Sequence, residues 1–199
     1  MSIISNIVVV VIAMFMVGCA GTAGTEFTKL ETNQLAYGLD TPESIKQILG
    51  EPYQEGAVTK NDRQFKTMSY AYSSTGGDAA YKDVIAVRSQ GFYFNNNKLV
   101  GHEFTSTWSV DSTDFDESKV GEIKKGTTTI QQVIELLGKP GGEYIYPLAK
   151  NETEKTKVYL YQQTSGSVFN LKFYQEMLLV SYDENGIVTD VEFIASGDK

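Results

Sequence analysis

Cysteine and histidine are almost absent from this sequence, with one residue of each among 199. One cysteine excludes an internal disulfide, a CxxC redox pair and a cysteine-rich zinc site. One histidine excludes a metal centre built from two or three histidines. Positive charge is also scarce, since 17 Lys and Arg against 25 Asp and Glu give a net charge of −8. Because nucleic-acid binding depends on clustered basic residues, the composition argues against a nucleic-acid partner.

Charge is missing from the start of the chain, where the first charged side chain is Glu26. Residues 3–17 read IISNIVVVVIAMFMV, which is shorter than the ~20 apolar residues of a membrane-spanning helix but typical of a secretory signal. The segment that follows, MVGCA at 16–20, resembles a bacterial lipobox. The resemblance implies cleavage before Cys19, diacylation of its sulfur and acylation of the new amino terminus, for example with palmitate. We therefore predict a lipoprotein signal peptide at 1–18, then the lipidated Cys19 with a flexible tether at 19–26.

The lipobox also implies a location. In a host with two membranes, Ala20 rather than Asp after the lipidated cysteine implies sorting to the outer membrane. Several acyl chains hold a folded domain on a bilayer, because each buried CH₂ contributes ~0.8 kcal/mol. We expect the protein at the periplasmic face of the bacterial outer membrane, contacting the membrane through its N-terminal lipid.

The rest of the sequence repeats itself at an offset of 88 residues. YGLDTPESIKQILGEP at 37–52 aligns with KGTTTIQQVIELLGKP at 125–140, and each copy predicts a short helix with the same ends. Thr and Gly stand where an N-cap and a C-terminal cap with positive φ are expected. These capping residues are Thr41 and Thr129, Gly50 and Gly138. Apolar residues between the caps recur at the spacing of one helix face.

Three strands rich in Tyr and Phe are predicted after each helix. They cover 65–73, 85–94 and 99–106 in the first copy and 156–163, 169–182 and 187–196 in the second. The glycine pair at 141–142 is assigned to a turn. The expected fold class is α+β, with two tandem repeats at 27–106 and 119–196 joined by an acidic linker at 107–118. Each repeat is expected to pack short helices on one face of a three-stranded antiparallel sheet.

The capped-helix pattern, the three-stranded meander and the lipobox together resemble the SmpA/OmlA family of outer-membrane lipoproteins. That family includes the BamE subunit of the β-barrel assembly machinery, and the resemblance covers residues 30–104 and 119–194. The tandem duplication resembles the secreted β-lactamase inhibitor proteins, whose two units form a concave sheet surface that grips an enzyme. The resemblance implies a non-enzymatic assembly or scaffold subunit that binds an envelope or periplasmic protein. The alternative is an inhibitor or immunity protein that blocks an enzyme through a concave double-sheet surface.

No catalytic cluster emerges from the residues. His102 is the single candidate general base, and its place in a predicted strand favours a histidine that is half-packed or at the surface. Acidic groups at 114–117 and 183–184 lack the ligand loop of a calcium site. We therefore expect no enzyme activity, no cofactor, no metal and no small-molecule substrate.

Tyrosines on the predicted strands are the candidate partner surface, because an open sheet face with Tyr suits protein binding. The candidates are Tyr70, Tyr72, Tyr93, Tyr159 and Tyr161.

Overall fold

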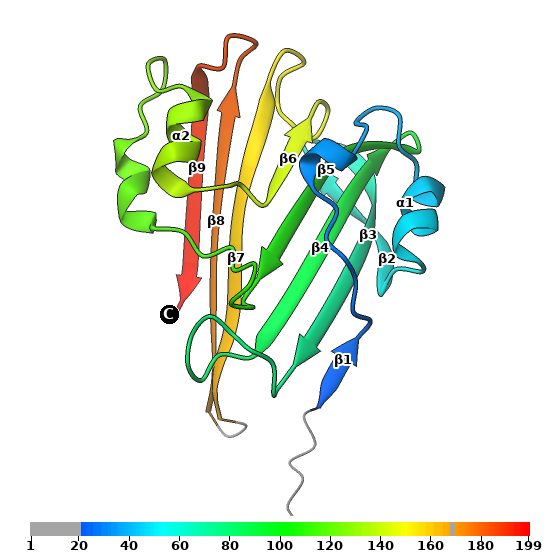
Figure 1. Ribbon diagram of the computed structural model, residues 1–199. Coiled ribbons are helices and arrows are strands. Elements are labelled where there is room, and N and C mark those ends of the chain that lie inside the picture. The colour runs from blue at the N-terminus through cyan, green and yellow to red at the C-terminus, as the bar shows by residue number, and fades with distance from the viewer. Residues whose placement is uncertain (1–20, 168–169) are drawn as a thin grey trace, which may run out of the picture.

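The computed structural model describes residues 21–167 and 170–199 as a strongly curved antiparallel sheet with a few short helices on one side (Figure 1). The strands are β1 (Thr22–Gly24), β2 (Gln54–Lys60), β3 (Arg63–Ser74), β4 (Ala86–Asn95), β5 (Lys98–Ser106), β6 (Gly142–Ile145), β7 (Lys155–Ser167), β8 (Asn170–Tyr182) and β9 (Val188–Gly197). The helices are α1 (Pro42–Leu49), α2 (Ile130–Leu137) and the 3₁₀ turns η1 (Thr32–Gln34) and η2 (Glu117–Glu122).

The predicted α+β class, with helices packed on a three-stranded sheet in each repeat, is wrong, because the strands form a single nine-stranded antiparallel sheet. Its order is β1-β3-β4-β5-β6-β7-β8-β9, with β2 pairing a second stretch of β3. The two halves of the chain meet where β5 pairs with β6, at Gly101 opposite Tyr144 and His102 opposite Glu143. Helical content is small, because α1 and α2 have only eight residues each. The repeat and linker boundaries remain predictions.

The six strands expected from alternation are all present, as β3, β4, β5, β7, β8 and β9. Three strands were missed, and each is short or poor in alternating apolar residues. β1 reads TAG, β2 reads QEGAVTK and β6 reads GEYI. Gly142, assigned to a turn, is the first residue of β6. This error hid the connection between the two halves, because β6 is the strand that joins them.

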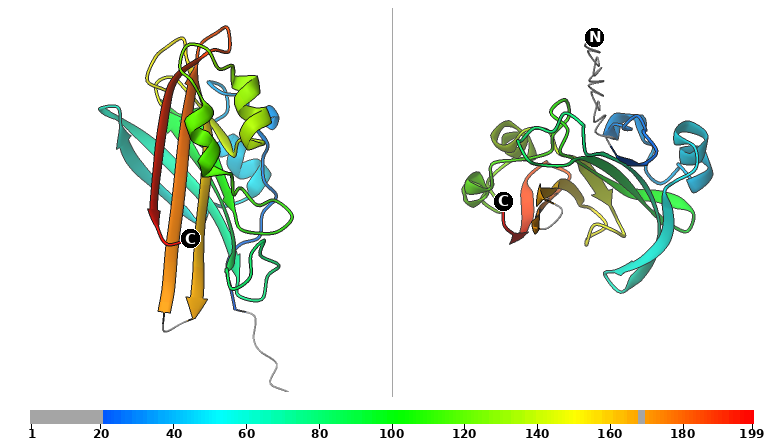
Figure 2. Two further views of the ribbon diagram at one scale, coloured as in Figure 1. Left: turned by 90° about the vertical axis from the view of Figure 1, so that its left-hand side faces the viewer. Right: turned by 90° about the horizontal axis from the view of Figure 1, so that it is seen from below.

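The sheet has two unlike faces. Figure 2 shows α1 and α2 on the same side, with the sheet curling away from them. We call this side the helix face and the opposite side the concave face. Ile45 of α1 and Val133 of α2 are both fully buried and centre separate apolar clusters on the helix face. A third cluster includes Val158 and Leu160, which alternate along β7 with residues of the helix face and therefore lie on the concave face.

The helix ends match the sequence prediction. Thr41 Oγ1 accepts from Ser44 N–H at 3.2 Å, and Thr129 Oγ1 accepts from Gln132 N–H at 3.2 Å. Each helix thus begins with a reciprocal capping box. Gly138 ends α2 at φ 85° and ψ −169°, a conformation open essentially to glycine alone.

Gly138→Val should therefore destabilise the protein. A β-branched side chain at this positive φ is strained, and we expect the free energy of unfolding to fall by about 2 kcal/mol in urea titrations. Gly121→Val is the matched control, because Gly121 has no positive φ and open space around its Cβ position. Equal stability of the two variants would contradict the assignment of Gly138 as a conformational cap.

Candidate binding surface

The upper part of the concave face is filled by the connection between β6 and β7. Leu148 in this connection is 5 % exposed and packs over Gly101, where a Cβ would lie 2.5 Å from Leu148 Cδ2. The Asn61 side-chain amide, in the turn between β2 and β3, donates to Leu148 O at 3.1 Å. Two elements of the first half, β5 and the β2–β3 turn, therefore hold the connection in place, and it forms a fixed floor for the concave face.

A polar cluster lies on this floor. The hydroxyls of Tyr93 and Tyr144 both donate to the Glu103 carboxylate, the first at 2.7 Å. Lys60 Nζ lies 4.8 Å from the ring centre of Tyr93 and 5.2 Å from that of Tyr144, within cation–π range. Burial, and then the charge of Glu103, raises the pKa of both tyrosines. Both hydroxyls therefore stay protonated as donors, and the cluster is a rigid arrangement of one cation, one anion and two rings.

Exposed apolar side chains continue along β8 and β9. Leu171 is 46 % exposed, Phe173 63 % and Ile194 62 %. They alternate with the buried residues of the helix face, so they project from the concave face together with the partly buried Met177 and Leu179. We call these five residues the apolar stripe. Beside Phe173 is an open hollow of about 450 Å³, which is also lined by residues of β4, β7 and β9.

The tyrosines predicted as a partner surface do not form one exposed surface. Tyr70, Tyr159 and Tyr161 are 3 %, 2 % and 0 % exposed. The Tyr70 and Tyr159 hydroxyls donate to Gly50 O and Gly138 O at 2.8 and 3.0 Å, which ties β3 and β7 to the helix ends. Alternation correctly placed each pair of tyrosines on one face of its strand, but that face is the one the helices cover.

The remaining two tyrosines are half-buried and lie on opposite faces. Tyr72 stacks on Trp108 with ring centres 5.9 Å apart, on the helix face. Tyr93 alone belongs to the concave face. The signal that could have found the apolar stripe was the apolar character of both faces of β8, where Leu171 and Phe173 alternate with Tyr174.

His102 lies in the core beneath the helix face. It is 1 % exposed, its Nδ1 lies 2.6 Å from the Tyr37 hydroxyl, and its ring packs near Phe92. Burial, followed by the positive charges of Lys29 and Lys157, lowers the pKa of His102 to about 3. The imidazole is neutral at physiological pH and closed to solvent, so it has a packing role.

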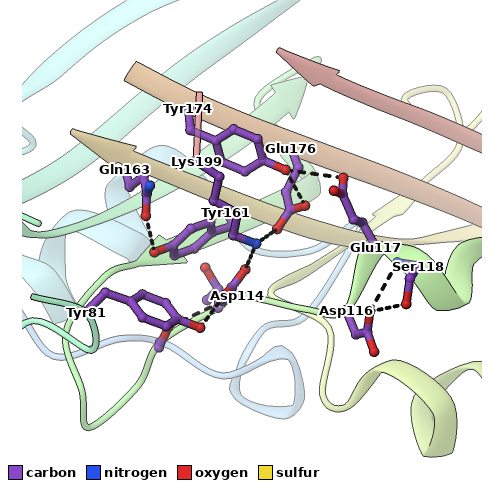
Figure 3. A network of polar contacts seen from close by, with 12 residues as sticks. Tyr81, Asp114, Asp116, Glu117, Ser118, Tyr161, Gln163, Tyr174, Glu176 and Lys199 are labelled. Atoms are coloured by element: carbon purple, nitrogen blue, oxygen red, sulfur yellow. Dashed lines mark hydrogen bonds and ion pairs between the residues drawn. The ribbon is translucent and has the colours of Figure 1, made fainter. Parts of the chain in front are cut away.

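A partly buried polar network joins segments that are distant in the sequence (Figure 3). Lys199 Nζ lies between two carboxylates, 2.6 Å from Asp114 Oδ1 and 3.4 Å from Glu176 Oε1. The Tyr81 hydroxyl donates to Asp114 at 2.5 Å, and the Tyr174 hydroxyl donates to Glu176 at 2.9 Å. The network connects the 75–85 loop, the segment before η2, β8 and residue 199.

The two carboxylates of this network titrate differently. Burial, reinforced by the contact with Asp114, raises the pKa of Glu176 to about 7. Burial alone would also raise the pKa of Asp114, but the hydrogen bonds from Lys199 and Tyr81 outweigh it and lower that pKa. Each carboxylate oxygen of Asp114 and Glu176 already contacts a side chain of the same chain, so the network has a structural role. We call the network of Tyr81, Asp114, Tyr174, Glu176 and Lys199 the clasp.

The other acidic residues considered in the sequence also have local partners. Asp116 accepts from Ser118 N–H at 3.1 Å and caps η2, and Asp183 accepts from Asn185 N–H at 2.9 Å in a turn. Across residues 21–167 and 170–199, no group of three or more His, Cys, Asp or Glu side chains is placed to hold a metal ion.

The predicted signal peptide and Cys19 lie outside the described residues. Among the residues that are described, no helix has the length and apolar character needed to cross a membrane.

No protein-family model matches the chain, and no curated protein matches it in sequence. The chain has a distant similarity to a crystal structure of a protein from Streptococcus mutans that is provisionally described as a beta-lactamase inhibitor protein. It shares 12 % sequence identity at a TM-score of 0.42, and the match covers 81 % of this chain and 91 % of that one. The resemblance to the SmpA/OmlA family therefore remains a prediction.

Proposed function

We propose that this protein is a non-enzymatic binding protein that holds a folded envelope protein against its concave face. In this proposal Cys19 carries the lipid anchor and the described residues form the domain that the anchor presents to its partner. The protein acts as an assembly or scaffold subunit, with the concave face as its working surface.

The observation that carries the proposal is the exposed apolar stripe. Large apolar side chains that stay exposed to water in groups mark interaction sites in soluble domains. Phe173 and Ile194 are each more than 60 % exposed although they lie on the largest sheet of the molecule. The rigid Tyr93–Glu103–Tyr144 cluster lies on the same face, so this part of the surface needs little ordering when a partner binds. The concave face therefore combines exposed apolar side chains with a fixed polar region, and protein interfaces contain both.

The test is a crosslinked pull-down of the tagged, anchored protein from its own envelope, analysed by mass spectrometry. We expect Phe173→Asp to reduce recovery of the specific partner by about 10-fold, because a charge replaces one of the most exposed apolar side chains of the stripe. Leu39→Asp is the matched control, since Leu39 is 74 % exposed away from the apolar stripe and its substitution introduces the same charge.

The identity of the partner separates the scaffold from its alternative. Recovery of subunits of an envelope complex supports the scaffold, whereas recovery of a single hydrolase or toxin supports the inhibitor or immunity protein. Cys19→Ala should abolish function in the cell while leaving binding of the purified partner unchanged. Equal recovery by Phe173→Asp and Leu39→Asp would exclude the concave face as the binding surface.

A further inference from the structure

The two edges of the sheet are protected unequally. At one edge the outermost strands are β1, which has only three residues, and β2, which carries the charged residues Glu55 and Lys60. At the other edge, among the described residues, β9 has no strand neighbour except β8. Its first residue, Val188, also exchanges hydrogen bonds with the 126–128 turn. The free edge therefore begins after Val188 and runs to Gly197.

The second half of β9 lacks the usual devices that prevent edge pairing. Natural edges carry charges, proline or bulges. In the first half of β9, Asp190 is engaged by Lys125 and Lys150, and a bulge lies opposite Ser181 and Tyr182. Residues 193–197 read FIASG, without charge or proline, and all five are exposed. This stretch is an open template for another strand.

The β8–β9 hydrogen bonds determine which residues of β9 direct their backbone N–H and C=O groups toward β8 and which direct them into solvent. Asp198 N–H donates to Phe173 O, and hydrogen-bonded pairs alternate along an antiparallel ladder. Ile194 therefore pairs toward β8, opposite Met177. Phe193 and Ala195 direct their backbone N–H and C=O groups away from β8, into solvent.

We propose that β9 pairs edge to edge with β9 of a second copy of this chain, antiparallel, with Ile194 opposite Ile194 of the second copy. In this register Phe193 and Ala195 exchange backbone hydrogen bonds with Ala195 and Phe193 of the second copy. The two sheets become one, and both concave faces lie on the same side of it. This inference concerns the β9 edge and does not depend on the proposed function.

Self-complementarity favours a second copy as the occupant, and the side-chain pairs are the reason for proposing this register. The large Phe193 faces the small Ala195, and Glu192 faces Ser196 rather than another acid. Moving the symmetry axis to residue 192 would place two Glu192 carboxylates directly opposite each other, which is destabilising. In the proposed register Asp190 faces Asp198, but Lys125 and Lys150 already balance the charge of Asp190.

Cysteine crosslinking of the full-length protein in its membrane tests the register. Ile194→Cys places two thiols in a non-hydrogen-bonded pair with Cα atoms about 4.5 Å apart, so oxidation should yield disulfide-linked dimers. Ser196→Cys is the matched control, because it is equally exposed but separates the two thiols by about 13 Å along the strands. Wild-type protein, with Cys19 alone, gives the background. We expect at least 5-fold more dimer with Ile194→Cys than with Ser196→Cys, whereas equal yields would overturn the proposal.

Light scattering of the detergent-solubilised protein tests the pairing without a new thiol. We expect the mass of two chains, with a larger dimer fraction at higher ionic strength because each copy carries a charge of −8. Ala195→Pro removes only an outward N–H and should give the mass of one chain with an unchanged circular dichroism spectrum. Monomeric wild-type protein at all salt concentrations would overturn the proposal, whatever the outcome for Phe173→Asp.

Discussion

Gly142→Ala should lower the free energy of unfolding by at least about 3 kcal/mol, because the added methyl group has no space. A Cβ at Gly142 would lie 2.1 Å from His102 O and 2.8 Å from Glu103 Cα. Both obstacles are backbone atoms of β5 and cannot rotate away. Relief requires β6 to move off β5, which would break the pairing of His102 with Glu143.

Thermal and urea unfolding measure this effect. For a chain of this size about 3 kcal/mol corresponds to a fall in Tm of roughly 6–12 °C. Gly121→Ala is the control, since a Cβ there meets nothing within 4 Å. A Gly142→Ala variant as stable as Gly121→Ala would mean that the β5–β6 contact does not hold the two halves together.

The β5–β6 contact also marks the limit of what the sequence predicts about the fold. Local signals were sufficient for the long strands and for the helix caps, because alternation and capping act within a few residues. Pairing between distant strands leaves no such signal. β6 offers only four residues, Gly142–Ile145, and its partner β5 ends 36 residues earlier at Ser106. A turn was therefore the natural interpretation of Gly142, and the way in which the two repeats join stayed open.

The binding surface shows the same limit. Alternation placed Tyr70 and Tyr72 on one side of a strand, but it could not show which side the helices cover. Phe173 was missed for a related reason, because the sequence of β8 does not show which of its two faces stays exposed. Its 63 % exposure becomes visible only once the curvature of the whole sheet is known.

Lys199→Met should destabilise the protein strongly, and the effect should depend on pH. Lys199 is the cation that compensates the charge of Asp114 and Glu176, and removing it leaves two neighbouring buried carboxylates unpaired. We expect a loss of about 2–3 kcal/mol at pH 8, because an unpaired buried charge is costly. At pH 5 the loss should fall below about 1 kcal/mol, since Glu176 is then protonated and neutral.

The direction in which stability changes with pH follows from the pKa shifts of Glu176 and Asp114. The pKa of Glu176 is raised from 4.5 to about 7 in the folded protein, so folding favours its protonated form. Its contribution to stability is complete below pH 4.5 and is lost as pH rises through 7. Asp114 has a lowered pKa, so its contribution is present above its ordinary value and is lost only in acid. The wild-type clasp should therefore be most stable between these limits and weaken by about 1–2 kcal/mol on the alkaline side.

Urea titrations at pH 5, 7 and 9 with wild type, Lys199→Met and Glu176→Gln decide between titration and simple packing. Glu176→Gln keeps the shape of the side chain but removes the titrating proton, so its stability should rise relative to wild type as the pH increases from 5 to 9. Lys199→Met should diverge from wild type in the opposite sense over the same range. If all three proteins lose stability in parallel, Glu176 does not titrate near neutrality and the segments meet there by packing alone. The predicted divergence would instead show that protonation of Glu176 controls how strongly the contacts of residue 199 and of the segment before η2 with β8 stabilise the fold.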